Sequence, residues 1–228
     1  LLKGKTTSGI SLVFITPPNF ERTFAVYPGA ALELAPEDLS KEMFYGYDYL
    51  HIEGYLLQNH ALVSRAVELA KSEGMIVSLD MASYNIVESN NIFLHDIIKD
   101  YVNIVFANKT EAETFTGCSP RKALDIIALM CDIAVVKIGK EGSMIKSGKE
   151  YHSVKAKPAV TVDETGAGDM YAAGFLFAHS NSLPLKYCGE VGSIVAAAAV
   201  EVMGTKIDLP RLQLVKRKIR ELTGLTFI

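Results

Sequence analysis

The chain has 228 residues, of which 49% are hydrophobic, and a formal net charge of -3. This length can bury a sizeable core and suits one α/β domain, while the dispersed lysines and arginines exclude the basic surface typical of nucleic-acid binding. Three cysteines far apart in the sequence exclude a zinc pattern and a disulfide framework, and no uncharged stretch is long enough to span a membrane. These features predict a soluble protein of the cytoplasm.

The N-terminal part of the sequence predicts a pair of strands followed by a short helix. The strands cover residues 10–16 and 22–27, and residues 17–20 between them include two prolines. The short helix is expected to start at Pro36, because proline suits the first helical position. The apolar run at residues 49–52 predicts the next strand.

The middle of the chain alternates helices and strands. Apolar residues recur at helical spacing after residue 60, which predicts a helix with one buried face: Leu62, Val63, Ala66, Leu69 and Ala70. Residues 75–79 then form a buried strand that ends at Asp80, and further strands are expected at residues 102–107 and 133–138, with helical segments between them.

This alternation predicts an α/β fold with a doubly wound, mostly parallel sheet flanked by helices. Residues 143–147 and 150–156 add a β-hairpin, with Gly148 first in its turn. Ligands of such sheets bind at the carboxyl ends of the strands. Four residues are expected at such ends: Asp80, Asn108, Gly139 and Asp163.

Residues 163–169, with the sequence Asp-Glu-Thr-Gly-Ala-Gly-Asp, predict an anion site between a β-rich apolar run and a helix. Gly166 and Gly168 have no side chain, so a phosphate can approach the backbone N–H groups of Gly166, Ala167 and Gly168, where the helix dipole favours negative charge. Asp169, in the first helical turn, can accept the proton of a hydroxyl that attacks a γ-phosphate. The pattern indicates phosphoryl transfer to an alcohol; a glycine turn before an ordinary N-terminal aspartate is the alternative.

Two further segments follow expected strands. Asn108 and Glu111 open the helical segment at residues 111–116, and their spacing also fits a simple capping box. Lys137 precedes Gly139 and Gly142, which lie three residues apart in a turn. This lysine either contacts a phosphate or is a solvated residue at the end of a strand.

The last third of the chain predicts two more helices. Residues 184–203 form a long apolar segment that begins with proline and contains four consecutive alanines. Small residues in such a helix allow close packing against neighbours or against a flat ligand. The basic run at residues 216–220 predicts the solvated face of a final helix.

Three of these segments resemble motifs of the ribokinase family of small-molecule kinases, also called the PfkB carbohydrate kinases. Residues 163–169 are similar to the family motif Asp-Thr-x-Gly-Ala-Gly-Asp, with Glu164-Thr165 in place of Thr-x. Residues 108–111 resemble its Asn-x-x-Glu motif, and residues 137–142 resemble Thr-x-Gly-x-x-Gly with lysine in place of threonine. Residues 21–39 resemble the lid region of bacterial adenosine-kinase-like members.

The resemblance implies an ATP-dependent kinase that transfers the γ-phosphate to a primary hydroxyl of a nucleoside or sugar, with an adenosine-kinase-like activity favoured. Asp169 is then the catalytic base, and the amides of Gly166, Ala167 and Gly168 stabilise the transferring phosphoryl group. A ribokinase- or fructokinase-type sugar kinase, a non-catalytic nucleotide- or sugar-binding relative, and an inactive fragment stay open as alternatives.

The resemblance also implies cofactors. Asn108 and Glu111 would hold Mg²⁺ through water, and Asp163 is a candidate ligand of K⁺. Many relatives carry an asparagine where this chain has Val195, so a mainly apolar base pocket is expected. The implied nucleotide-binding residues are Asn108, Glu111, Lys137, Gly139, Gly142 and Val195.

The family pattern further divides the chain into part of a small β lid, residues 1–30, and an α/β nucleotide-binding core, residues 31–228. The family's N-terminal third, with its substrate-binding aspartate and Gly-Gly segment, is not found here, so we expect a fragment or an incomplete sequence, in which the sheet lacks its first strands. Lids of several members pair two subunits, which implies a homodimer. Arg22 and Tyr27 are candidate lid contacts, with exposed strand residues as the alternative.

Other nucleotide-binding classes fit less well. A dinucleotide-binding oxidoreductase requires Gly-x-Gly-x-x-Gly, but the residue three positions after Gly168 is Tyr171. A P-loop enzyme requires Gly-x-x-x-x-Gly-Lys-Ser/Thr, which the sequence does not contain.

Overall fold

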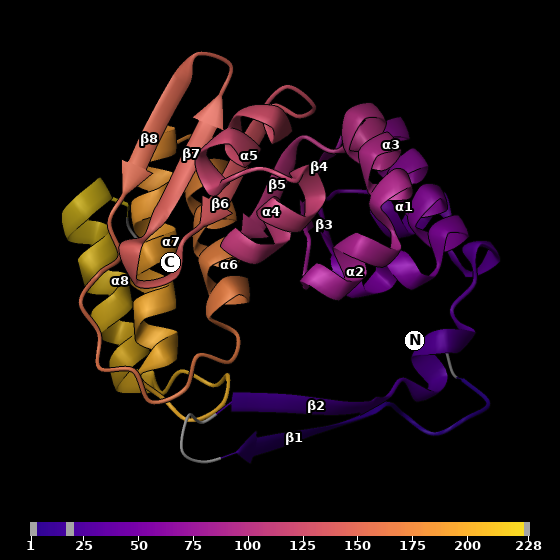
Figure 1. The fold of residues 1–228 in the computed structure, drawn as a ribbon, viewed down its shortest axis with the longest axis horizontal. Coiled ribbons are helices and arrows are strands. Elements are labelled where there is room, and N and C mark those ends of the chain that lie inside the picture. The colour runs from indigo at the N-terminus through magenta and orange to yellow at the C-terminus, as the bar shows by residue number, and fades with distance from the viewer. Residues whose placement is uncertain (1–3, 17–20, 226–228) are drawn as a thin grey trace.

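The computed structural model describes residues 4–16 and 21–225, as a six-stranded sheet with helices on both faces and a separate two-stranded ribbon (Figure 1). The connection expected at residues 17–20 lies outside the described residues. Within the described ranges, no helix combines the length and the apolar character needed to cross a bilayer. The architecture confirms the expected mostly parallel sheet flanked by helices.

The strands of the sheet lie side by side in the order in which they occur in the chain. The first four pair in parallel, and the last two continue the sheet as an antiparallel hairpin. The strands are β3 (Tyr49–Glu53), β4 (Ile76–Asp80), β5 (Ile104–Asn108), β6 (Ile133–Lys137), β7 (Ser143–Ser147) and β8 (Glu150–Val154). The register aligns Glu53 with Asp80 and Asn108 with Lys137, so polar residues meet at the carboxyl edge.

One face of the sheet is covered by the helices that connect the parallel strands. They are α1 (His60–Ser72), α2 (Tyr84–Ser89), α3 (Asn91–Tyr101), α4 (Lys109–Thr116) and α5 (Pro120–Ile127). The apolar stripe of α1 is buried in one core with Val77, Val105 and Val136 of the strands. Asn59 caps this helix, because its side chain accepts a hydrogen bond from the Leu62 N–H at 3.1 Å.

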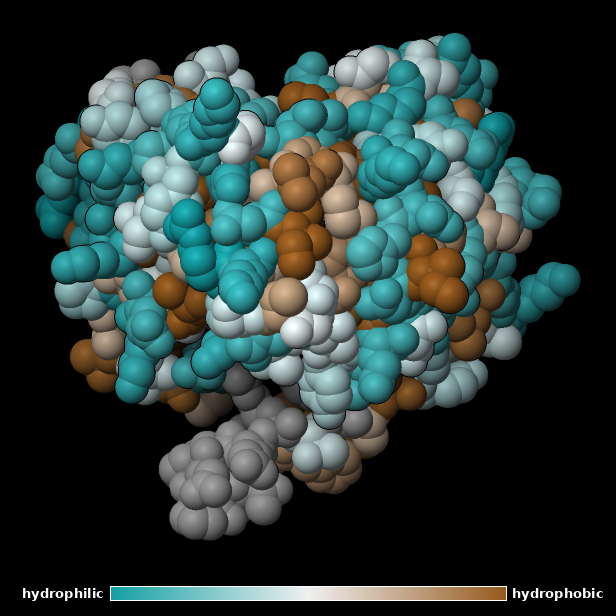
Figure 2. All heavy atoms as spheres, turned by 45° about the horizontal axis from the view of Figure 1, so that its top comes forward, coloured by the Kyte–Doolittle hydropathy of each residue, from teal (hydrophilic) through white to brown (hydrophobic). Residues whose placement is uncertain are grey.

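The other face is covered by the three C-terminal helices α6 (Ala167–Ser180), α7 (Leu185–Val200) and α8 (Leu209–Thr223). Small residues bring α6 and α7 close together, since a Cβ atom on Gly174 would lie 3.0 Å from the Cα of Gly192. Phe106 of the sheet and Phe175 of α6 meet edge to face, with ring centroids 5.3 Å apart. With apolar residues gathered in these two cores, most of the surface in Figure 2 is hydrophilic, apart from a strip of hydrophobic side chains near its middle.

The ribbon consists of β1 (Ile10–Thr16) and β2 (Glu21–Tyr27), which pair antiparallel with Ile10 opposite Tyr27. Figure 1 shows it apart from the sheet, below the end of the molecule where α6 begins. Short 3-10 helices follow it and also occur after β3 and β6; they cover Gly29–Glu33, Pro36–Asp38, Lys41–Phe44, Gly54–Gln58 and Gly139–Glu141.

One expected strand is wrong. No strand or helix occurs at residues 155–166, so the apolar run before Asp163 is irregular. The N–H groups of Val162 and Asp163 donate to the carbonyl oxygen of Val200, at the end of α7, at 2.7 and 3.2 Å. Asp163 therefore does not lie at the carboxyl end of a strand, whereas Asp80 and Asn108 do. The long apolar helix also ends earlier than expected, at Val200 instead of residue 203.

Candidate functional site

The candidate site lies where the carboxyl edge of the sheet meets the start of α6. Asp80 ends β4 and Lys137 ends β6. The Nζ atom of Lys137 lies 2.5 Å from Oδ2 of Asp80, and a Cβ atom on Gly168 would lie 3.1 Å from the same nitrogen. The fold thus brings the glycine turn and the ends of two strands into one site.

The glycine turn forms the start of α6. Gly166 precedes the helix with a φ of 76°, in the left-handed region that favours glycine. The Ala167 N–H donates to the carbonyl oxygen of Glu164 at 3.2 Å. The N–H groups of Gly168 and Asp169 belong to the first turn, where α-helix geometry provides no partner within the helix. The turn therefore offers backbone donors and the positive end of a helix dipole to an anion.

Asp163 holds this turn in place. Its Oδ1 accepts hydrogen bonds from the N–H and the hydroxyl of Thr165, at 2.9 and 2.7 Å, and its Oδ2 accepts from the Gly204 N–H at 2.9 Å. The carboxylate therefore ties the glycine turn to the segment after α7. These hydrogen bonds give Asp163 a structural role in the turn.

Asp169 is exposed at the site and carries a perturbed carboxyl group. Partial loss of water contact raises its pKa, and the nearby carboxylates of Glu53 and Asp80 raise it further. Lys137 and His51 act in the opposite direction. A carboxylate with a raised pKa is a stronger base than an ordinary aspartate, as proton acceptance from an alcohol requires.

Asn108 and Glu111 form a complete capping box at the start of α4. The backbone N–H and side-chain amide of Asn108 donate to the two oxygens of Glu111 at 2.7 and 2.5 Å, and the Glu111 N–H donates back to Oδ1 of Asn108 at 2.9 Å. The Glu111 side chain is only 2% exposed, and burial raises its pKa to about 7. Capping thus explains the pair's geometry but not the burial of its carboxylate.

The donor set fits Mg²⁺ held through water. Among the described residues, no group of three or more His, Cys, Asp or Glu side chains is arranged to bind a metal directly. Mg²⁺ keeps several waters and needs only one or two carboxylates from the protein. Both oxygens of Glu111 already accept hydrogen bonds from Asn108, so this carboxylate suits contact with a metal-bound water.

The turn after β6 requires glycine. Gly142 has a φ of 109°, and a Cβ atom there would run into the carbonyl oxygen of Val154. Its own carbonyl oxygen accepts the Ile138 N–H at 2.8 Å, and its N–H donates to Gly139 at 2.9 Å. The turn is therefore a compact unit directly after Lys137. Its role in nucleotide binding stays a prediction.

Val195 lies in the contact between two helices. Its side chain is half-buried, and a Cβ atom on Gly174 would lie 2.9 Å from its Cγ2 atom. The assignment of Val195 to a base pocket also stays a prediction.

Two residues near Asp169, His51 and Glu53 of the edge strand β3, were not predicted as site residues from the sequence. The Nδ1 atom of His51 lies 2.9 Å from the hydroxyl of Ser78, and its Nε2 atom lies 3.3 Å from Oε1 of Glu53. Because the strand was expected to end at residue 52, Glu53 was not recognised as a strand-end residue. Extending the strand by one residue would have placed it beside Asp80.

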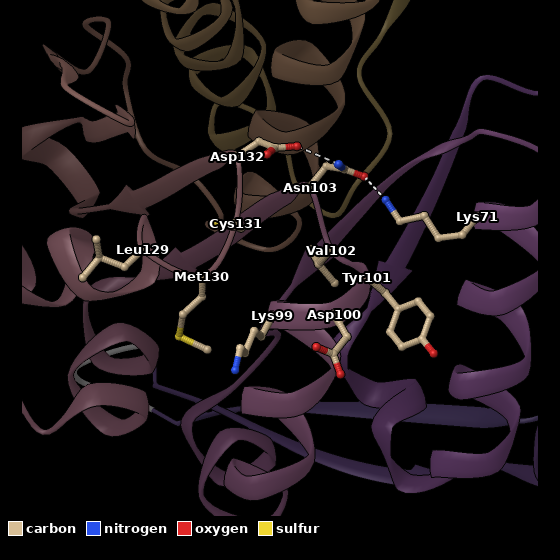
Figure 3. Close-up of a pocket in the computed structure, with 10 residues that line it drawn as sticks. All are labelled: Lys71, Lys99, Asp100, Tyr101, Val102, Asn103, Leu129, Met130, Cys131 and Asp132. Atoms are coloured by element: carbon tan, nitrogen blue, oxygen red, sulfur yellow. Dashed lines mark hydrogen bonds between the residues drawn. The ribbon is translucent and has the colours of Figure 1, made fainter.

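A cavity of about 290 Å³ lies at the opposite, amino edge of the sheet (Figure 3). In it Asn103 bridges two charged residues, accepting from Lys71 Nζ at 2.5 Å and donating to Asp132 at 2.6 Å. Its lining contains none of the predicted site residues; it consists of Lys71, Lys99, Asp100, Tyr101, Val102, Asn103, Leu129, Met130, Cys131 and Asp132. The candidate site is therefore defined by side chains and backbone donors at the carboxyl edge.

Comparison with known proteins finds one family along most of the chain. The model of the pfkB family of carbohydrate kinases matches residues 1–212. A protein of Archaeoglobus fulgidus, described as an uncharacterized sugar kinase, is 28% identical over 217 residues, which are 92% of this chain and 84% of that protein. A nucleoside kinase of Methanothermobacter thermautotrophicus is 37% identical over 152 residues, 64% of this chain and 46% of that protein.

Solved structures show the same fold. The crystal structure of adenosine kinase from Sinorhizobium meliloti matches with a TM-score of 0.85 at 29% identity, covering 92% of this chain and 65% of that chain. The chain thus spans less than two thirds of the length of the nucleoside kinase and the adenosine kinase that it matches.

Proposed function

Because the chain belongs to the pfkB family of carbohydrate kinases, we propose that it transfers the γ-phosphate of ATP to a primary hydroxyl group, with a nucleoside as the acceptor. The observation that carries this proposal is the position of Asp169 in the first turn of α6. It directly follows Gly168, where the place of a Cβ atom is 3.1 Å from the Nζ atom of Lys137 at the end of β6. A base and an anion site are thus adjacent, as phosphoryl transfer requires.

In the proposed reaction, the acceptor oxygen forms a bond to the γ-phosphorus while the bond from that phosphorus to ADP breaks. Asp169 accepts the hydroxyl proton, and partial burial, together with the neighbouring carboxylates, strengthens it as a base by raising its pKa. The N–H groups of the Gly166–Gly168 turn stabilise the charge on the transferring group. Such preorganised donors contribute about 10²- to 10³-fold in turnover.

We assign the cofactors from the donors that are present. Mg²⁺ would neutralise phosphate charge, and Asn108 and Glu111 would hold its waters. Asp163 is a candidate ligand of K⁺, because its carboxylate lies beside the glycine turn and is joined to it by the hydrogen bonds from Thr165. Activity in potassium salts would then exceed activity in tetramethylammonium salts, and equal rates would remove K⁺ from the proposal.

The nucleoside acceptor is supported by two relatives, the S. meliloti adenosine kinase and the M. thermautotrophicus nucleoside kinase. The A. fulgidus relative supports a sugar as the alternative. An assay of ADP release by the full-length protein with Mg-ATP, screening adenosine, other nucleosides, ribose and fructose, tests both. Release that depends on a nucleoside supports the proposal, whereas retained ATP binding with no release for any acceptor favours a non-catalytic binding protein.

The β1–β2 ribbon is proposed as part of a lid that excludes water from the site and pairs with a second copy of the chain. Apolar side chains on it are more than half exposed, among them Leu12, Phe14 and Val26. Tyr27 is 53% exposed, while the side chain of Arg22 lies outside the described residues. We expect Phe14→Lys to shift the mass measured by light scattering from dimer to monomer; a wild-type monomer would refute the pairing.

A further inference from the structure

His51 and Ser78 form a polar pair on the face of the sheet that packs against α6. They lie opposite each other in the register of β3 and β4, and the Nδ1 atom of His51 is 2.9 Å from the hydroxyl oxygen of Ser78. Ser78 is fully buried, and the His51 ring meets the core ring of Phe106 edge to face, with centroids 6.3 Å apart. Apolar groups of the same shape in place of both partners are often nearly neutral for stability. Stability alone is therefore a weak reason for this hydrogen-bonded pair.

His51 also contacts Glu53, two positions further along the same strand. Side chains two positions apart lie on one face of a strand, and the Nε2 atom of His51 is 3.3 Å from Oε1 of Glu53. An ionised carboxylate only accepts hydrogen bonds, so Nε2 carries the hydrogen. In the neutral ring Nδ1 is then an acceptor, and the Ser78 hydroxyl donates to it. The three side chains thus form one hydrogen-bonded chain from the buried face to the end of the strand.

Ser78 is a suitable partner for His51 in both protonation states. In the protonated ring both nitrogens donate. The Ser78 oxygen then accepts from Nδ1, and its own hydrogen can turn to the carbonyl oxygen of Leu50, which lies 3.4 Å away. A hydroxyl both donates and accepts, whereas alanine or valine would do neither. His51 can therefore gain or lose a charge without losing its place.

Glu53 is held at the carboxyl edge of the sheet by its backbone as well. It ends β3 and lies opposite Asp80, the last residue of β4. A Cβ atom on the next residue, Gly54, would lie only 2.7 Å from the carbonyl oxygen of Met81, so the ends of the two strands are in close contact. The backbone at Glu53 therefore has little freedom, and the contact with His51 fixes the side chain in addition.

Asp169 is surrounded by charges from several elements. Partial burial raises its pKa, and Glu53 on β3 and Asp80 on β4 raise it further. Lys137 on β6 and His51 on β3 act in the opposite direction. The ammonium group of Lys137 lies 2.5 Å from the carboxylate of Asp80, so their opposite effects on the base partly cancel. A further titratable group that faces Asp169 comes from the 3-10 helix Gly54–Gln58, the phenol of Tyr55.

We propose that His51 is a positioning residue for the base: its ring, fixed by Ser78, holds the carboxylate of Glu53 and offsets the negative charge of that carboxylate beside Asp169. This inference rests on the proposed function, in which Asp169 accepts the proton of the acceptor. A raised pKa strengthens a base only while the group is ionised at the working pH. An uncompensated carboxylate nearby favours the protonated, inactive form. His51 thereby extends the activity toward acid pH.

The test is the pH dependence of kcat/KM, whose acid limb reports the ionisation of the essential base. ADP release by the full-length protein is followed from about pH 5 to about pH 9, a range that includes the titration of histidine. We expect His51→Leu to lower the maximum and to move the acid limb upward by about 0.5 to 1 pH unit, less than the roughly 1 to 3 units that a charge in direct contact produces. The KM for ATP should stay nearly unchanged. An acid limb at the wild-type pH would overturn the proposal.

The conservative variant His51→Gln separates position from charge. Glutamine can still donate to Glu53 and accept from Ser78, but it never becomes charged. We expect the wild-type maximum of kcat/KM together with the upward shift of the acid limb. A merely structural role would lower the maximum and leave the limb in place. This variant also keeps the test informative if His51→Leu fails to fold.

A double-mutant cycle tests whether His51 acts through Glu53. Glu53→Gln alone should move the acid limb downward, because it removes a negative charge near Asp169. In this background His51→Leu should cause a smaller shift than in the wild type, since a positioning residue acts through its partner. Equal shifts in both backgrounds would refute the positioning role. Ser78→Ala, which removes one anchor of the ring, should shift the limb in the same direction as His51→Leu, but less.

The matched control is His152 on β8, the opposite edge strand of the sheet. Its Nε2 atom lies 2.6 Å from Oε1 of Glu150, which is also two positions away on the same strand. His152→Leu should leave the maximum and the acid limb unchanged. If the wild-type protein releases no ADP with any acceptor, the proposed function itself fails. If it transfers phosphate but His51→Leu and His51→Gln keep the wild-type acid limb, only the role of His51 fails.

Discussion

The buried carboxyl group of Glu111 makes the stability of the folded chain depend on pH. Burial raises its pKa from an ordinary 4.5 to about 7. The folded state therefore binds this proton more tightly than the unfolded state, so the stabilising effect is fully present below pH 4.5 and is lost as the pH rises toward 7. At 1.36 kcal/mol per pH unit, the interval between these two pKa values corresponds to about 3 kcal/mol.

Glu111→Gln should remove this loss, because glutamine does not titrate. Glutamine can accept only one of the two hydrogen bonds from Asn108, so a constant destabilisation of about 1 kcal/mol is expected in addition. Urea unfolding in the presence of EDTA, from about pH 5 to about pH 8, measures the free energy of unfolding of both proteins. Glu113→Gln, on the same helix, is the control and should retain the wild-type slope. Parallel curves for wild type and Glu111→Gln would refute the reasoning.

Three further substitutions test the site and its support. Asp169→Asn should lower turnover at least about 100-fold with little change in ATP affinity, because it removes the base and leaves the backbone donors; similar turnover in a coupled assay would exclude Asp169 as the base. Gly166→Ala should lower the affinity for a non-hydrolysable ATP analogue, because alanine disfavours the φ of 76° that shapes the turn; an unchanged dissociation constant in calorimetry would contradict this. Gly174→Ala should destabilise the fold by about 1–3 kcal/mol, because its Cβ would lie 3.0 Å from Gly192 Cα; an unchanged unfolding midpoint would refute tight helix contact.

Much of the fold could be predicted because its signals are local. Continuous apolar runs identified the buried strands β4, β5 and β6, and the spacing of apolar residues identified α1. Gly148 identified the hairpin turn between β7 and β8, where its φ is 52°. In each case the residues that determine the element lie within it.

The wrong strand before Asp163 shows where local signals fail. Val160, Thr161 and Val162 are β-branched and favour extended structure, but strand formation also needs a neighbouring strand. Here the Val162 N–H donates to Val200 at the end of a helix, and Val160 is 77% exposed. Whether these residues form a strand depends on the path of the chain after β8, and the local sequence pattern does not reveal that path.

The ion pair between Lys137 and Asp80 also could not be predicted from the sequence, because Asp80 lies 57 residues earlier in the chain. From the sequence, Lys137 had two interpretations, a phosphate contact or a solvated strand end, and the 14% exposure of its side chain excludes the second. Asp80 was placed correctly at the end of a strand, but its partner was unknown. The polar residues expected at strand ends therefore located the edge of the site from the sequence. The contacts between side chains across that edge could be seen only in the structure.

Several features that are unfavourable for stability occur together at this edge of the sheet. Asp80 and Lys137 bury opposite charges, Glu111 buries a carboxyl group whose pKa rises to about 7, and Ala82 has a left-handed backbone. A capping box works equally well with an exposed glutamate, so capping does not account for the burial of Glu111. Local rules of stability are broken together mainly where a protein performs chemistry. Their coincidence at the carboxyl edge is an argument for a site there that does not depend on motif similarity.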